Sequence, residues 1–140
     1  MPFTLENIHP LVIHFPIALL STGLFFDILS RIFQREDLEH GGFWCMLMGI
    51  ISCLMANFTG LIAFLSEASF SELPQFIHGL LMWCATIIIA ILLWVRIKLQ
   101  LDLQYSPLKR NIYLLIHIIA LFILFYAAHL GAIAEREWLI

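Results

Sequence analysis

The chain has 140 residues, of which 62% are hydrophobic and 12% are charged, and its mean hydropathy is +0.97. Such a composition excludes an ordinary soluble globular domain and indicates an integral membrane protein. The seven lysines and arginines are too few and too dispersed for a nucleic-acid surface. The length allows about four spanning helices of roughly 20 residues each, in one membrane domain over residues 1–140.

Four apolar segments predict an all-α fold, an integral membrane four-helix bundle. The charged stretch 31–40 cannot enter hydrocarbon and is expected to be a loop. Asp27 stands four residues before Arg31, a spacing that suits a local ion pair near the end of the first helix. The helices are expected at about residues 9–32, 41–66, 75–95 and 112–134.

The basic residues predict an orientation for these helices. Six of the seven flank the first and third connections, whereas only Arg136 lies on the other side. By the positive-inside rule we expect the N-terminus and the C-terminus to face the outer, periplasmic side. The six are Arg31, Arg35, Arg96, Lys98, Lys109 and Arg110.

Three helices place a histidine at nearly the same depth. With 1.5 Å of rise per residue, His14 and His129 lie roughly 8 Å inside the outer ends of their helices, and His78 lies roughly 5 Å inside. His9 lies just above this level. His117 stands twelve residues before His129 and belongs to the inner leaflet, in a different environment.

Neutral imidazole is a good ligand for haem iron, zinc and copper, and helix bundles commonly hold cofactors between facing helices. We therefore expect a metal or a b-type haem at this level, with His14 and His78 as first-choice axial ligands and His129 as the principal substitute. Phe122 and Phe125 share the face of His129 and are expected to pack on the edge of a macrocycle. The alternative for each histidine is a hydrogen bond to a loop carbonyl or a lipid headgroup, and for the phenylalanines plain core or lipid contact.

The three cysteines form neither a CxxC pair nor a CxxCH motif, so the sequence predicts no disulfide framework, no zinc site and no covalent c-type haem. A non-covalent haem remains compatible with this pattern.

The motif HPLVIHFPIALL, the later segment TGLIAFL, a histidine at the start of the third helix and the closing AHLGAIAE together resemble a known family. It is an uncharacterised four-helix bacterial membrane-protein family, a domain of unknown function with an HPxxxHFPIA motif. The same domain is also found fused to planctomycete-type c cytochromes. The resemblance matches His9, His14, His78, His129 and Gly131, whereas Ala132 stands where the family usually has a second glycine. The association with cytochromes implies electron transfer by context alone.

The sequence thus leads us to expect a multi-pass protein of the bacterial inner membrane that binds haem b and relays electrons between quinol and a periplasmic acceptor. Membrane or periplasmic redox proteins would be its partners, and catalysis on a substrate by this chain alone is not expected. The competing interpretation is a non-catalytic structural or accessory subunit of a larger membrane complex, whose histidines bond to partner residues or hold a pigment or lipid. Proton or metal transport is the function that we favour least. A pathway across the membrane would need a series of polar side chains, and the sequence offers few for it, namely Asp27, Asn57 and His117.

Overall fold

The computed structural model describes residues 5–66, 73–99 and 106–137, and every regular element in these ranges is an α-helix. The expected all-α four-helix architecture is confirmed. All four helices are long and apolar enough to cross a membrane. They are α1 (Leu5–Phe33), α2 (Glu36–Ser66), α3 (Leu73–Lys98) and α5 (Pro107–Glu137).

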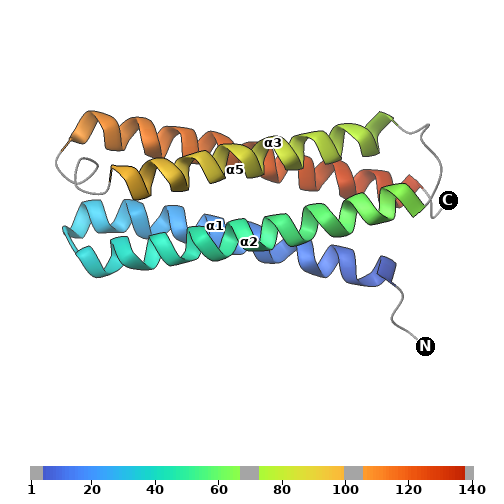
Figure 1. Cartoon of the computed structure of the whole chain (residues 1–140), viewed down its shortest axis with the longest axis horizontal. Coiled ribbons are helices and arrows are strands. Elements are labelled where there is room, and N and C mark those ends of the chain that lie inside the picture. Colours follow the sequence, from blue (N-terminus) through green and yellow to red (C-terminus); the bar gives the residue numbers. More distant parts are fainter. Residues whose placement is uncertain (1–4, 67–72, 100–105, 138–140) are drawn as a thin grey trace.

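The helices run alternately up and down, so α1 and α3 begin at the end of the bundle where α2 and α5 finish (Figure 1). Each helix packs against two neighbours, in the ring α1–α2–α3–α5, and the pairs α1–α2 and α3–α5 make the more extensive contacts. We call the end where α1 and α3 finish the basic end, because it carries Arg31, Arg35, Arg96, Lys98, Lys109 and Arg110. We call the other end, where α1 and α3 begin, the opposite end.

The expectation of a loop over residues 31–40 is wrong, because only Gln34 and Arg35 separate α1 from α2. Gln34 adopts a left-handed conformation with φ of 52°, and the Arg35 N–H donates to the Ser30 carbonyl at 3.2 Å. This is the Schellman pattern that closes a helix. Glu36 and Asp37 then stand in the first turn of α2, where the helix dipole favours negative charge.

The core lies along the bundle axis and is built mostly from aliphatic, sulfur-containing and small side chains. Its fully buried residues include Leu20 of α1, Met46 and Cys53 of α2, Ile89 of α3 and Leu124 of α5. A Cβ atom built on Gly23 would lie 3.2 Å from the Gly42 carbonyl oxygen, so α1 and α2 approach closely where both lack side chains. Small residues at such crossings are typical of membrane helix pairs.

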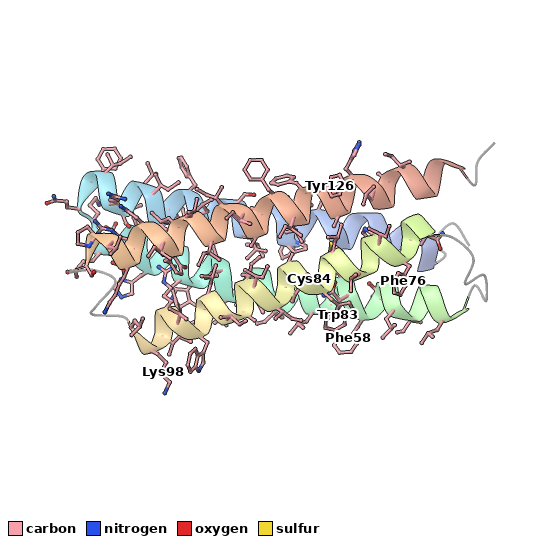
Figure 2. The ribbon with its side chains drawn as sticks, turned by 90° about the horizontal axis from the view of Figure 1, so that it is seen from above. Phe58, Phe76, Trp83, Cys84, Lys98 and Tyr126 are labelled. Atoms are coloured by element: carbon pink, nitrogen blue, oxygen red, sulfur yellow. The ribbon has the colours of Figure 1, made fainter. Side chains whose placement is uncertain are left out.

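The exterior is also apolar, as expected for a surface that faces lipid. Large side chains such as Phe76 (59% exposed) and Tyr126 (58% exposed) project from the bundle, as Figure 2 shows. Phe58 of α2 and Trp83 of α3 contact each other edge to face, with ring centroids 6.1 Å apart. Because interior and exterior are both apolar, hydropathy identifies the helices but not the face that each turns inward.

Candidate histidine site and buried ion pair

His78 lies on the inner face of α3, together with the buried Met82 and Ala85. Its Nδ1 is 2.6 Å from the carbonyl oxygen of Ala127 on α5, which makes Nδ1 the protonated donor of this tautomer. A Cβ atom on Gly131 would lie 2.9 Å from the His78 ring, so this glycine makes room for the imidazole. The glycine of the AHLGA segment therefore serves packing between α3 and α5, whereas Ala132 is exposed.

His14 and His129 instead lie on the outer surface of the bundle, and both are exposed. On α1 the fully buried Pro16 faces the core, and His14, two residues earlier, points away from it. On α5 the same relation holds between the buried Ala127 and His129. The imidazoles of His14 and His129 are thus outside the core that His78 adjoins.

A contact near the basic end fixes the register between α1 and α5. The Arg31 guanidinium donates to the Asn111 side-chain oxygen. From Asn111 to His129 is 18 residues, or five helical turns and about 27 Å, so His129 lies on the same stripe of α5 as the residue that contacts α1. From Arg31 back to His14 is 17 residues, or about 26 Å in the same direction. His14 and His129 therefore lie at nearly the same level.

His14 lies about 100° around α1 from Arg31, the residue that reaches α5. Ile17 and Ser21 follow His14 by three and seven residues on the same side of α1, and both are half-buried, so His14 is at the edge of the lipid-facing surface. Phe122 and Phe125, 71% and 50% exposed, share the outward face of His129 as predicted. The structure therefore places His14 and His129 at nearly one level on the outer surface of two neighbouring helices, apart from the inward-facing His78.

The remaining histidines have different surroundings. The backbone of His9 belongs to the first turns of α1, but its side chain lies outside the described residues. His40 is exposed, with Nδ1 2.8 Å from the Glu36 carbonyl oxygen. His117 is completely buried, and neither ring nitrogen has a hydrogen-bond partner among the described residues. In the part of the chain that the structure describes, no three His, Cys, Asp or Glu side chains gather into a metal-binding cluster.

Near the basic end, the interior of the bundle holds an ion pair in which Asp27 has a different partner from the one that its sequence spacing suggests. Asp27 of α1 pairs with Arg96 of α3, not with Arg31: both Asp27 oxygens are 2.8 Å from guanidinium nitrogens of Arg96. Arg96 also donates to the Tyr113 hydroxyl at 3.2 Å and to the Glu39 carbonyl at 2.7 Å. These bonds join all four helices, because Glu39 lies on α2 and Tyr113 on α5.

The four-residue spacing between Asp27 and Arg31 does not indicate the correct pair, because it does not show which face of α1 turns towards the interior. Asp27 faces inward and is 7% exposed, whereas Arg31, four residues later, is exposed and reaches α5. A Cβ atom on Gly42 would lie 2.2 Å from an Asp27 carboxylate oxygen, so the carboxylate occupies space that this glycine leaves free. Asp27 and Arg96 both stand at the basic end, and that shared level is the signal that could have suggested the pair.

A second polar contact lies deeper in the core. The Asn57 side-chain amide donates to the Thr86 hydroxyl at 3.0 Å, which joins α2 to α3. Thr86 in turn donates to the carbonyl of Met82 at 2.8 Å. Asn57 therefore connects two helices, one of the roles that polar residues have in membrane bundles.

These features define a multi-pass, all-helical membrane protein with histidines at one level near the opposite end and a buried four-helix ion-pair network near the basic end. The chain belongs to the family described as predicted membrane protein (DUF2231), which matches residues 5–137. This confirms the resemblance to an uncharacterised four-helix membrane family. No curated protein and no solved structure is significantly similar to the chain.

Proposed function

We propose that the protein is a haem-binding electron-transfer subunit whose axial ligands are His14 and His129. The observation that carries this proposal is the presence of two exposed imidazoles at one level on neighbouring membrane-spanning helices. Ionisable side chains are costly within a membrane unless they have a partner, and they commonly mark functional sites. A bis-histidine b-type haem takes two such ligands and offers an apolar edge to the surrounding lipid.

The two pairings that include His78 fit less well. His78 faces inward between α3 and α5, whereas His129 is on the outward side of α5, so α5 separates the two rings. His14 faces away from the interior, and α1 packs against α2 and α5 rather than against α3. The first-choice pair of His14 and His78 is therefore replaced in our proposal by His14 and His129.

The residues near His14 and His129 suit a flat macrocycle. Phe122 and Phe125 are exposed on the face of His129 and offer aromatic surface on its basic-end side. A bound haem would supply one-electron redox chemistry, and the chain would supply ligands, orientation and a low dielectric. Electron exchange with quinol in the bilayer and with a periplasmic acceptor is the role that we propose for this site.

A reduced-minus-oxidised absorption spectrum of the purified, haem-replete protein tests the proposal. We expect a sharp alpha band that disappears in His14→Ala and in His129→Ala, because each substitution removes an axial ligand. His78→Ala and His40→Ala are the matched controls and should retain the band. A colourless preparation of the unsubstituted protein would refute haem binding, and loss of the band in His78→Ala would refute the ligand assignment.

A second candidate function is an accessory subunit of a larger membrane complex. It is favoured by the same exposure of His14 and His129, because a partner helix could cover these rings and accept their hydrogen bonds. In this case the protein is colourless, and cross-linking from cysteines placed at positions 14 and 129 should capture a partner in native membranes. Cysteines at exposed positions on the far side, such as 58 and 76, are the matched controls.

We further propose that the basic end faces the cytoplasm of a bacterial cell, so that both chain termini face the periplasm. The grouping of six basic residues at this end supports the orientation. A C-terminal alkaline phosphatase fusion should be active and a C-terminal green fluorescent protein fusion dark. The reverse pattern would overturn the orientation.

A further inference from the structure

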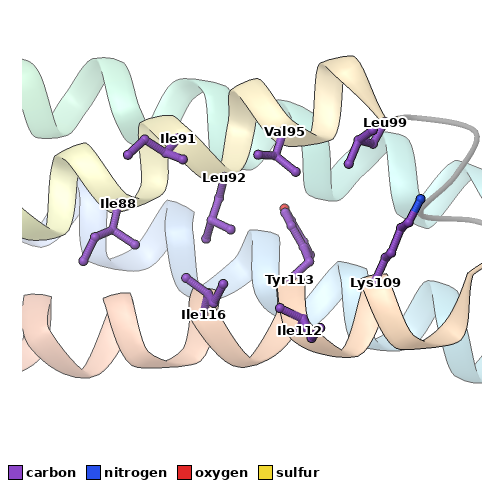
Figure 3. A pocket seen from close by; sticks show the side chains of 9 residues that line it. All are labelled: Ile88, Ile91, Leu92, Val95, Leu99, Lys109, Ile112, Tyr113 and Ile116. Atoms are coloured by element: carbon purple, nitrogen blue, oxygen red, sulfur yellow. The ribbon is translucent and has the colours of Figure 1, made fainter.

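The contact line between α3 and α5 differs between its two ends. Towards the basic end an apolar groove lies between the two helices, with Ile88 and Ile116 on its walls (Figure 3). Towards the opposite end the ring of His78 lies directly against Gly131 and occupies space that a side chain at this glycine would need. A polar ring is therefore packed between the two helices at this end.

Two contacts fix the orientation of the His78 ring. Nδ1 donates to the Ala127 carbonyl oxygen at 2.6 Å, so Nε2 carries the lone pair of this tautomer. A Cβ atom on Gly131 would lie 2.9 Å from Cε1 and 3.3 Å from Nε2, so the edge of the ring that bears both nitrogens lies against α5. Because the two nitrogens of an imidazole point to nearly opposite sides of the ring, Nε2 points away from the Ala127 carbonyl.

The lone pair on Nε2 is able to accept a hydrogen bond. Among the residues that the structure describes, no donor bonds to this atom. His78 is only half-buried, and the neighbouring Gly79 has open space where its Cβ atom would lie. Metal-ligating histidines are commonly held in the same way, with one nitrogen donating to a backbone carbonyl and the other directed at the ligand. The contact with Ala127 therefore prepares Nε2 of His78 to bind a hydrogen-bond donor.

His78 lies at the level of the proposed haem ligands, on the other side of α5. Ala127, which His78 contacts, is fully buried, whereas His129 is two residues later and exposed. Two residues along an α-helix correspond to about 3 Å of rise and about 200° of rotation, so the two imidazoles flank α5. An α-helix with its side chains is about 10–12 Å across, so molecules bound to these two imidazoles would lie about one helix diameter apart.

We propose that Nε2 of His78 accepts a hydrogen bond from a hydroxyl group of a membrane-soluble hydroquinone, the electron donor to the site on the other side of α5. This inference rests on the proposed function, which requires a quinol but does not say where it binds. Nε2 needs a donor, and the bundle presents apolar and aromatic side chains such as Phe76 and Tyr126 to the bilayer, so the ligand must be apolar apart from its hydroxyl groups. The oxidised quinone has no hydroxyl and loses this hydrogen bond, so the contact favours the reduced form.

Calorimetric titration of the purified full-length protein in detergent tests the contact. The probes are decylhydroquinone and its dimethyl ether, which has the same ring and chain but no hydroxyl group. In His78→Ala we expect the affinity for decylhydroquinone to fall about five- to tenfold, because one hydrogen bond is lost, and the affinity for the ether to stay unchanged. His78→Gln keeps a donor for the Ala127 carbonyl and an acceptor for the ligand, so it should retain more of the affinity.

His40→Ala is the matched control, because His40 also has Nδ1 bonded to a backbone carbonyl, that of Glu36, but lies at the basic end. It should leave both affinities unchanged. An unchanged affinity for decylhydroquinone in His78→Ala, or an equal loss for the ether, would overturn the proposal, since an equal loss indicates a purely structural role. A colourless protein that binds decylhydroquinone through His78 would refute haem binding but not this contact, and a protein with the alpha band but no effect of His78→Ala on affinity would refute this contact alone.

Discussion

Removing one member of the Asp27–Arg96 pair should strongly destabilise the bundle. Arg96 donates three hydrogen bonds, to Asp27, Tyr113 and Glu39, and the second carboxylate oxygen of Asp27 lies 2.8 Å from its guanidinium as an ion-pair contact. Both side chains are 7% exposed, so Asp27→Asn leaves a buried guanidinium charge without its counter-ion. Truncating one partner of such a pair costs about 3–5 kcal/mol. Arg96→Met should cost a similar amount because it leaves the carboxylate uncompensated.

The free energy of unfolding can be measured by titrating dodecyl sulfate into mixed micelles and following helix content by circular dichroism. The control is Arg31→Met, which removes an exposed arginine four residues from Asp27 and should cost less than about 1 kcal/mol. In the double variant Asp27→Asn/Arg96→Met, the two losses should fall short of additivity by about 1–3 kcal/mol. Equal destabilisation by Arg31→Met and Arg96→Met, or additive losses in the double variant, would refute the assignment of the pair.

Three further substitutions test packing by the same unfolding measurement. Gly42→Ala should destabilise by about 1–3 kcal/mol, because the new methyl group would lie 2.2 Å from a carboxylate oxygen of the ion pair. Gly131→Ala should also destabilise, since the methyl group would meet the His78 ring at 2.9 Å; Gly79→Ala, with open space at its Cβ, is the control and should stabilise by about 0.5–1 kcal/mol. His117→Phe should be neutral or stabilising, because it removes two buried nitrogens that have no described partner. A loss above about 2 kcal/mol in His117→Phe would show that those nitrogens have a partner such as buried water.

The depth of the candidate histidines could be predicted from the sequence, but the direction in which each imidazole ring faces could not. Helical rise along the four segments was enough to predict that His14, His78 and His129 share a level, and the structure places them so. Which rings face inward depends on the rotation of each helix about its axis. His78 faces α5 and bonds to Ala127, whereas His14 and His129 face outward.

The amino-acid sequence by itself determined the number of helices, their approximate limits, their alternating directions and the grouping of basic residues at one end. These properties depend on local hydropathy and on connections too short to allow other arrangements. The tertiary structure alone decided that Asp27 pairs with Arg96 and that Arg31 reaches Asn111. The physical reason is that lipid and protein interior are about equally apolar, so close packing and polar contacts set the rotation of each helix.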